Sequence, residues 1–153
     1  MFTAGLVHNM GKVALSIWLE NKIPAMLALA ARDDLTFDQV ERKLLGYDHA
    51  QVGAYMAEQW NLPKPLIDAI RYHHEPDNCP EKNPIVDCVH VGDFLTMSMG
   101  FGLGGDGLRY DFHERSLERL GLKAEIFDEL AVGFVDSVSK YEQLFMEMHK
   151  EAA

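Results

Sequence analysis

The chain has few basic residues, no long hydrophobic run and no closely spaced pair of cysteines. Only 14 Lys and Arg stand against 24 Asp and Glu, which gives a net charge of −10 over 153 residues. Nucleic-acid surfaces depend on clustered cations that neutralise phosphates, and no such cluster is present in the sequence. We therefore expect neither a nucleic-acid partner nor a broad contact with an anionic membrane.

No apolar segment approaches the roughly 20 residues that a helix needs to cross a bilayer. No basic leader precedes the first apolar residues. The two cysteines, Cys79 and Cys88, are separated by eight residues, which is not the spacing of a redox or metal-binding pair. Two isolated thiols suit a reducing compartment. These absences predict a cytoplasmic protein with no membrane association.

The chain does have hydrophobic residues at helical spacing. The hydrophobic fraction of 48% is enough for a core. Apolar residues recur every three or four positions, and none of the segments alternates as a strand would. The predicted helices cover Phe2–Glu20, Ala25–Arg32, Phe37–Leu45, His49–Trp60, Lys64–Tyr72, Pro84–Met99, His113–Leu120 and Lys123–His149. The predicted fold is an all-α bundle of about six to eight helices in a single domain, residues 1–153.

Glycines mark two places in this pattern. Gly5 and Gly11 interrupt the first predicted helix, where a small residue indicates the close approach of another helix or of a ligand. Residues 100–107 contain five glycines. That segment follows a helix rather than a strand and lacks the Gly-Lys-Ser/Thr ending of a phosphate-binding loop, so we interpret it as a connector.

Several side chains of the metal-ligand type are spread over the predicted helices. Imidazole nitrogens and carboxylate oxygens suit divalent iron, manganese, nickel or zinc, and separate helices of a bundle can bring them together. His49 falls in a first helical turn, where the helix dipole favours the neutral imidazole that binds metals. The candidate metal ligands are His8, Asn9, His49, His73, His74 and Asp93.

The same side chains have structural interpretations, which stay open. His73 and His74 are also suited to close a helix, because imidazolium favours the carbonyl end of the dipole. His8 can be a core histidine bonded to a backbone carbonyl, and Asn9 a buried hydrogen-bonding residue. Asp93 can pair with a nearby histidine.

Five segments carry a resemblance to a known family. GLVHNMGK at residues 5–12 resembles the GLLHDIGK segment of the HD superfamily of metal-dependent phosphohydrolases. GYDHAQVG at 46–53, WNLP at 60–63 and IRYHHEP at 70–76 resemble the HDOD branch of that superfamily. VHVGDFL at 89–95 resembles its VHLAD helix. The order and spacing of these motifs make the combination specific.

The resemblance implies an HD-like helical fold and a place in bacterial signal transduction. HDOD domains are regarded as outputs or scaffolds without demonstrated hydrolase activity, whereas the related HD-GYP proteins hydrolyse cyclic di-GMP at a multi-metal site. The GYP motif is absent here, because Pro76-Asp77-Asn78 follows His74-Glu75. Members of the family carry further helices before the HD doublet, so we expect these residues to be the C-terminal part of the family's usual domain.

The doublet itself departs from the catalytic pattern. It is His8-Asn9, where catalytic members have His-Asp. A neutral amide is a weaker ligand than a carboxylate and does not bridge two cations. The sequence therefore predicts a non-catalytic signalling module that has protein partners and retains a candidate divalent-metal site.

Two alternatives remain. The first is a metal-dependent phosphohydrolase acting on a nucleotide or cyclic dinucleotide, with Lys12 as the candidate phosphate contact. The second is a helical assembly protein that forms a homodimer through its long helix, residues 123–149.

Overall fold

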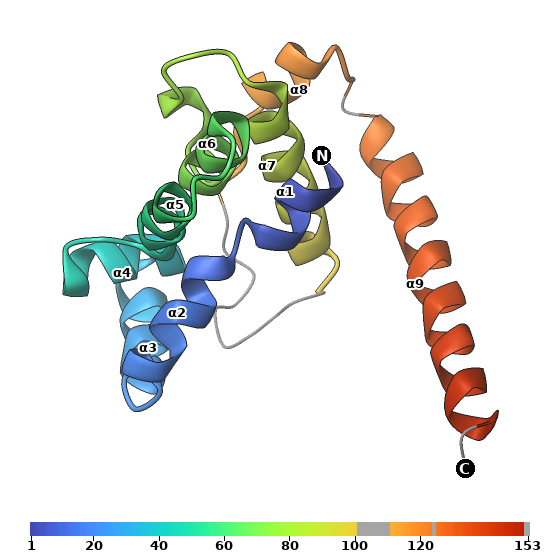
Figure 1. The fold of residues 1–153 in the computed structure, drawn as a ribbon, viewed down its shortest axis with the longest axis horizontal. Coiled ribbons are helices and arrows are strands. Elements are labelled where there is room, and N and C mark those ends of the chain that lie inside the picture. The colour runs from blue at the N-terminus through green and yellow to red at the C-terminus, as the bar shows by residue number, and fades with distance from the viewer. Residues whose placement is uncertain (101–110, 124, 152–153) are drawn as a thin grey trace. The chain divides into compact units, whose positions relative to one another are not determined.

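The computed structural model describes residues 1–100, 111–123 and 125–151, and the regular structure of these residues is entirely helical (Figure 1). The all-α prediction is confirmed. Most of the glycine-rich segment, residues 101–107, lies outside the described residues. The described elements are α1 (Phe2–Val7), α2 (Met10–Leu19), α3 (Ile23–Asp33), α4 (Phe37–Leu45), α5 (His49–Gln59), α6 (Lys64–Tyr72), the 3₁₀ turn η1 (Pro76–Asn78), α7 (Pro84–Ser98), α8 (Arg115–Leu120) and α9 (Ile126–Glu151).

The prediction of one continuous helix from Phe2 to Glu20 is wrong. The chain leaves the helix at His8 and Asn9, and Asn9 stands at φ −95° and ψ 13° as the residue before α2. The His8 ring bonds back to the carbonyl of Gly5, and the Asn9 amide bonds to the His8 ring. Short polar side chains that bond locally compete with helix continuation. The break places both polar side chains at a junction between two helices.

Local capping explains the limits of α4 and α5. Thr36 and Gln39 form a capping box at the start of α4, and Asp48 and Gln51 form one at the start of α5. Gly46 ends α4 with a φ of +83°, a conformation that glycine adopts without strain. The predicted limits of α4 and the predicted start of α5 at His49 are confirmed. The second box fixes the position of His49, the first residue of α5.

Helices α2 and α5 cross with their backbones in contact. A Cβ on Gly11 would lie 1.9 Å from the carbonyl oxygen of His49, and one on Gly53 would lie 2.9 Å from the Cγ2 of Ile70. The expected close approach at Gly11 is confirmed. At Gly5 it is not, because no heavy atom lies within 4 Å of an added Cβ. The crossing brings the start of α2 beside the start of α5.

Three buried apolar clusters hold residues 1–121 together as one compact unit. The first joins α2, α3 and α4, the second α1, α6 and α7, and the third α5 and α6. Their fully buried members include Met26, Val40, Ala4, Val86, Ala54 and Ile70.

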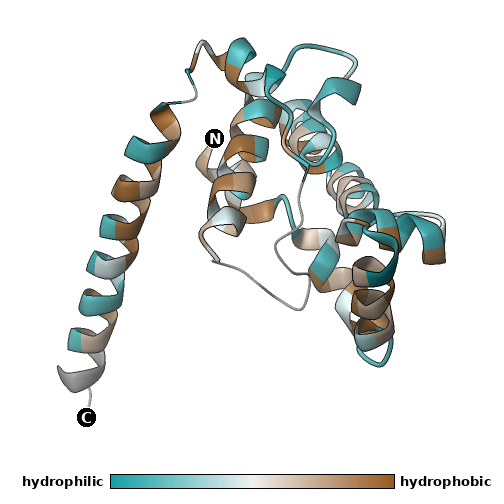
Figure 2. Cartoon of the chain, turned by 180° about the vertical axis from the view of Figure 1, so that it is seen from behind, coloured by the Kyte–Doolittle hydropathy of each residue, from teal (hydrophilic) through white to brown (hydrophobic). Residues whose placement is uncertain are grey.

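Residues 122–153 form a second unit, which contains α9. Hydrophobic and hydrophilic residues alternate along this helix (Figure 2). Among the described residues, no single helix has the length and hydropathy of a membrane span; Phe2–Leu19 and Ile23–Asp33 meet the test only as a pair bent by 115°.

Candidate metal centre

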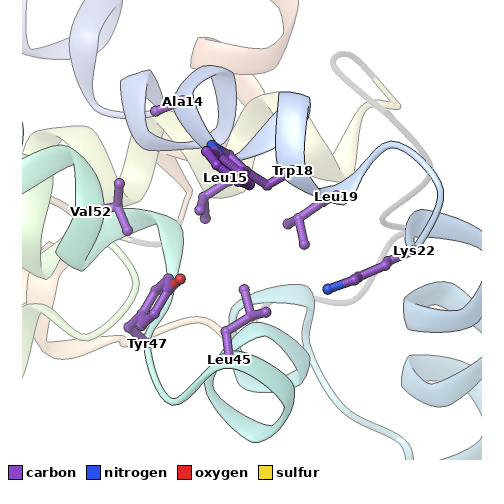
Figure 3. Close-up of a pocket in the computed structure, with 8 residues that line it drawn as sticks. All are labelled: Ala14, Leu15, Trp18, Leu19, Lys22, Leu45, Tyr47 and Val52. Carbon is purple, nitrogen blue, oxygen red and sulfur yellow. The ribbon is translucent and has the colours of Figure 1, made fainter.

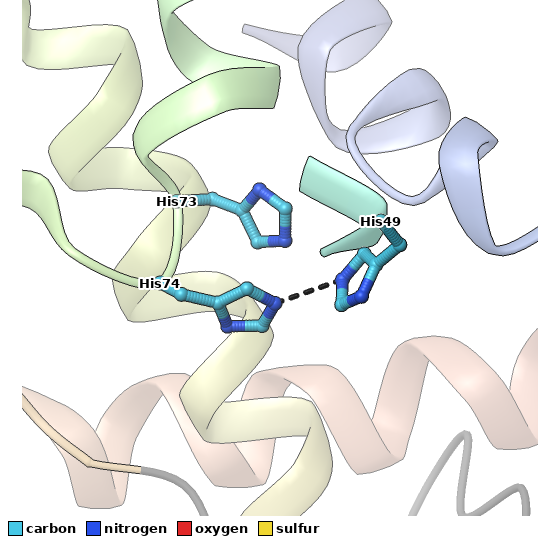
Figure 4. A group of neighbouring side chains, drawn as sticks. All are labelled: His49, His73 and His74. Atoms are coloured by element: carbon cyan, nitrogen blue, oxygen red, sulfur yellow. Dashed lines mark hydrogen bonds between the residues drawn. The ribbon is translucent and has the colours of Figure 1, made fainter. Parts of the chain in front are cut away.

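The structure brings the four predicted histidines together from three places in the chain. His8 follows α1, His49 opens α5, and His73 and His74 follow α6. Their ligand atoms fall into two groups, His49–His73–His74 (Figure 4) and His8–His73–Asp93, with all ligand atoms of a group within 4.8 Å of one another. Asp93 comes from α7. The centre therefore depends on the packing of α1, α5, α6 and α7.

Three of the imidazoles are held in the same tautomer. The Nδ1–H of His8 donates to the Gly5 carbonyl at 2.8 Å, and the Nδ1–H of His73 donates to the Ile70 carbonyl at 2.7 Å. The Nδ1–H of His49 donates to the Glu41 carboxylate at 2.6 Å. In a neutral imidazole the other nitrogen, Nε2, then carries a lone pair. A carbonyl or carboxylate behind the ring is the arrangement that orients metal-binding histidines.

The Nε2 atoms of these histidines lie close to one another or to a carboxylate. Because the Nδ1–H of His49 donates to Glu41, the Nε2 of His49 accepts the hydrogen bond that His74 donates from its Nε2–H. The Nε2 of His73 is buried with no hydrogen-bond partner in the described chain. The Nε2 of His49 lies 2.9 Å from the Nε2 of His74, and the Nε2 of His8 lies 3.3 Å from the Oδ1 of Asp93. A lone pair facing a carboxylate is repulsive unless a proton or a cation lies between them. The donor set and its geometry fit a divalent cation.

Burial sets the charge of this centre. Burial, together with the neighbouring imidazoles, holds the pKa of His73 and the pKa of His74 well below the usual histidine value. Both rings are therefore neutral near pH 7, which is the state that binds metals. For Asp93, burial favours the neutral acid, but the hydrogen bond and charge of His8 outweigh it, and the pKa is lowered. Asp93 is thus held as an anion beside His8.

The Asn9 amide donates a hydrogen bond to the lone pair of a ligand nitrogen, where a carboxylate would add a charged ligand. Its Nδ2 donates to the Nε2 of His8 at 2.8 Å. Its Oδ1 is buried and has no hydrogen-bond partner in the described chain. An unpaired buried carbonyl oxygen costs about 1–3 kcal/mol, so this oxygen is itself a point at which a cation or water would be stabilised. As an amide, it supplies no charge.

Glu41 was missed in the sequence and is part of this centre. Its side chain is 1% exposed, and its Oε2 accepts from both the backbone N–H and the ring Nδ1–H of His49. The available signal was a charged residue next to Val40 on the apolar face of α4, eight residues before His49. A charge on a buried face requires a partner, which this histidine supplies.

His90 is buried and contacts the backbone of His73. Its Nδ1–H donates to the His73 carbonyl at 2.8 Å, and its Nε2 accepts from the backbone N–H of His113 at 3.0 Å. With both nitrogens engaged, His90 is not a ligand. It holds the backbone of the His73–His74 corner against α7.

Two cations, Arg42 and Lys12, act on the centre or its surroundings. Arg42 donates to Asp38 at 2.6 Å and to Asp48 at 2.5 Å, and it lies 2.9 Å from Glu75. Because three carboxylates neutralise this guanidinium, it stabilises the fold and is not a phosphate contact. The charge of Lys12 lowers the pKa of both His74 and Asp93, so the Lys12 ammonium acts on both ligand groups.

A cavity of about 290 Å³ opens beside His74. Both signs of charge line it, from Arg42 and Arg71 to Asp48 and Glu75. Among the residues of the histidine centre, His74 lines this cavity.

A scan of known families matches residues 1–76 to the HDOD domain. A solved structure of an HDOD domain protein with unknown function from Geobacter sulfurreducens shares 29% identity and a TM-score of 0.61, over 74% of this chain and 38% of that one.

Two curated relatives are also similar. A Ribonuclease Y of Thermus thermophilus is 31% identical over 132 residues, which are 84% of this chain and 20% of that protein. An uncharacterized protein of Treponema pallidum is 29% identical over 101 residues, 65% of this chain and 19% of that protein. The chain spans about a fifth of the length of these relatives.

Proposed function

Residues 1–76 of this chain belong to the HDOD domain family, as their motifs predicted, and from this premise we propose that the chain is a non-catalytic interaction module of a signalling protein. In this proposal the histidine centre binds a divalent cation that stabilises the fold. Protein partners, rather than a substrate, are the ligands of the module.

The state of Asn9 carries the proposal. A hydrolytic centre of this kind needs negative charge to bind its cations tightly and to hold two of them close together. At this position the chain supplies a neutral amide, whose Nδ2 also engages the Nε2 of His8. The centre keeps the histidines that confer affinity and lacks the carboxylate that would join the two ligand groups.

The residues that would hold a cation are those whose ligand atoms lie within 4.8 Å of one another. His49, His73 and His74 form one set, and Asp93 with His8 supplies the other side of the shared His73. A divalent cation supplies Lewis acidity at such a centre. Glu41 and the Ile70 carbonyl keep the rings of His49 and His73 turned toward the common space. This is sufficient for binding and for cross-linking α5 to α6.

A metal-dependent phosphohydrolase is the second candidate. Two observations favour it: the two adjacent ligand groups that share His73, and the similarity to a protein named Ribonuclease Y. In this case Lys12, whose charge acts on both groups, would position a phosphate. The acidic balance of the chain works against a polyanionic substrate.

A hydrolysis assay separates the two candidates. The protein is purified without a histidine tag, loaded with Mn²⁺ or Fe²⁺, and assayed with bis(p-nitrophenyl) phosphate, cyclic di-GMP and single-stranded RNA. We expect no turnover above that of the metal ion alone. Turnover that disappears in the His74→Ala variant would establish the hydrolase and refute the non-catalytic module.

A further inference from the structure

An apolar cavity of about 510 Å³ lies between α2, the end of α4 and the start of α5 (Figure 3). Leu15 and Leu19 are buried at 7% and 3% exposure, and Trp18 beside them is 78% exposed. Tyr47 faces α2 across the cavity (Figure 3). The remaining lining residues are Ala14, Lys22, Leu45 and Val52.

The size and lining are those of a small-molecule site. Ligand pockets typically measure about 300–1,000 Å³ and combine an apolar lining with a few polar groups that fix orientation. Here the polar groups are the Lys22 ammonium and the Tyr47 phenol. A large exposed aromatic such as Trp18, next to buried leucines, is an apolar surface that a ligand would remove from water.

The charge of the cavity defines the ligand. The Lys22 side chain extends toward the space between Leu19 and Leu45 (Figure 3), and no ion pair involves it within the described part of the chain. By contrast Arg32 and Lys43 both pair with Asp33, and Lys64 pairs with Asp68. Because the protein carries a net charge of −10, an anion is repelled over much of its surface. Lys22 thus has no carboxylate partner among the described residues and lies beside an apolar cavity. An anion with an apolar body would gain there both an ion pair with the ammonium and the burial of its body.

We propose that this cavity binds an amphipathic monoanion, a molecule with an aliphatic or aromatic body and a single carboxylate or sulfonate. The body packs on Leu15, Leu19 and Trp18, and the anionic head pairs with the Lys22 ammonium. None of these residues belongs to the histidine centre. The site therefore stands whether or not the centre binds metal or hydrolyses phosphodiesters.

Three probes with one alkyl chain test the charge requirement: decanoate, decanol and decylammonium. In a Trp60→Phe background, Trp18 is the sole tryptophan, and its fluorescence reports on the cavity directly. We expect saturable binding of decanoate, at least fivefold tighter than that of decanol, and no saturable binding of decylammonium. The Lys22→Gln variant is expected to bind decanoate and decanol alike. Lys82→Gln removes another exposed lysine and is expected to keep the preference.

Several outcomes overturn the proposal. Equal affinity for all three probes, or a preference for decanoate that survives Lys22→Gln, places binding elsewhere. The Leu45→Asp variant places a carboxylate in the cavity, so decanoate binding that is undiminished in this variant would also show that the ligand binds elsewhere. Sedimentation that shows a dimer lost on Trp18→Ser would assign the surface to a second copy of the chain.

Discussion

At the scale of single residues, the side-chain amide of Asn9 limits how tightly the centre can bind a cation. Replacing its amide with a carboxylate in Asn9→Asp adds an anionic ligand beside His8. We expect the affinity for Mn²⁺ to rise at least about tenfold, because hard divalent cations gain affinity with ligand charge. Isothermal titration and elemental analysis measure this change. Asn9→Ala is the control and should not raise affinity; unchanged metal content in Asn9→Asp would contradict a converged centre.

Glu41 acts on the centre through His49. In Glu41→Gln the side chain keeps its shape but loses the charge that receives the Nδ1–H of His49. Residues that orient metal-binding histidines typically change affinity by 10–100-fold, so we expect Mn²⁺ binding to weaken about tenfold.

The control for this variant is Glu58→Gln. Glu58 pairs with Arg71 at the surface, at 45% exposure, and its loss should leave metal affinity unchanged. Equal effects of the two substitutions would show that general charge, and not the orientation of His49, sets the affinity.

The sequence could predict some residues of the centre and not others. His8, His49, His73, His74 and Asp93 were predicted because each sits in a recognisable motif. Glu41 lies outside these motifs. His90 lies inside one, but its role, like that of Glu41, arises only from what packs against it. The carbonyl of His73 that His90 holds is a backbone atom, and no residue type encodes it.

At the scale of helices, the α2–α5 crossing makes Gly11 irreplaceable. A Cβ there would lie 1.9 Å from the His49 carbonyl oxygen, and a backbone atom cannot move aside as a side chain can. We expect Gly11→Ala to lower the free energy of unfolding by about 3 kcal/mol or more, as overpacking against a backbone does. Urea unfolding measures it.

Gly5→Ala is the matched comparison in the neighbouring helix. Open space surrounds the position, so the substitution should stabilise the protein by roughly 0.5–1 kcal/mol through helix propensity alone. If both substitutions change stability equally, the close crossing does not exist in solution.

Helix limits could be predicted where local chemistry sets them. The limits of α4 were predicted correctly because Thr36 and Gly46 cap it, and those of α6 because Pro63 precedes it. The break after α1 was missed because the apolar periodicity continues across His8 and Asn9. There the His8 ring bonds to Gly5 and to Asp93, and the second of these partners lies 85 residues away.

For the whole molecule, the buried histidines predict loss of stability in mild acid. The pKa values of His73 and His74 are lowered in the folded state, so the unfolded chain binds more protons below the ordinary histidine value of 6.5. The free energy of unfolding of the metal-free protein should be flat above that pH. His73 and His74 should then lower it by up to about 2.7 kcal/mol per pH unit below that pH, at about 1.36 kcal/mol for each. His90, whose pKa is also lowered by burial, adds to the fall.

Carboxylates do not account for this loss. Asp77 and Asp93, whose pKa values are lowered from 3.8, release their stabilisation only in stronger acid. His113→Gln is the control, since that ring is partly exposed. Urea titrations at pH 7.5, 6 and 5 give the slope, and a flat profile across them would show that His73 and His74 are solvated.

The separation of His8 from Asp93 also governs when the centre can exist. During synthesis His8 emerges first, and its partner arrives only after 85 more residues have been added. Contacts between such distant positions form late, because a long loop must close before they are made. His8 therefore cannot make its contact with Asp93 until α7 has left the ribosome. A cation that joins the two ends would be captured only by a chain that has completed its fold.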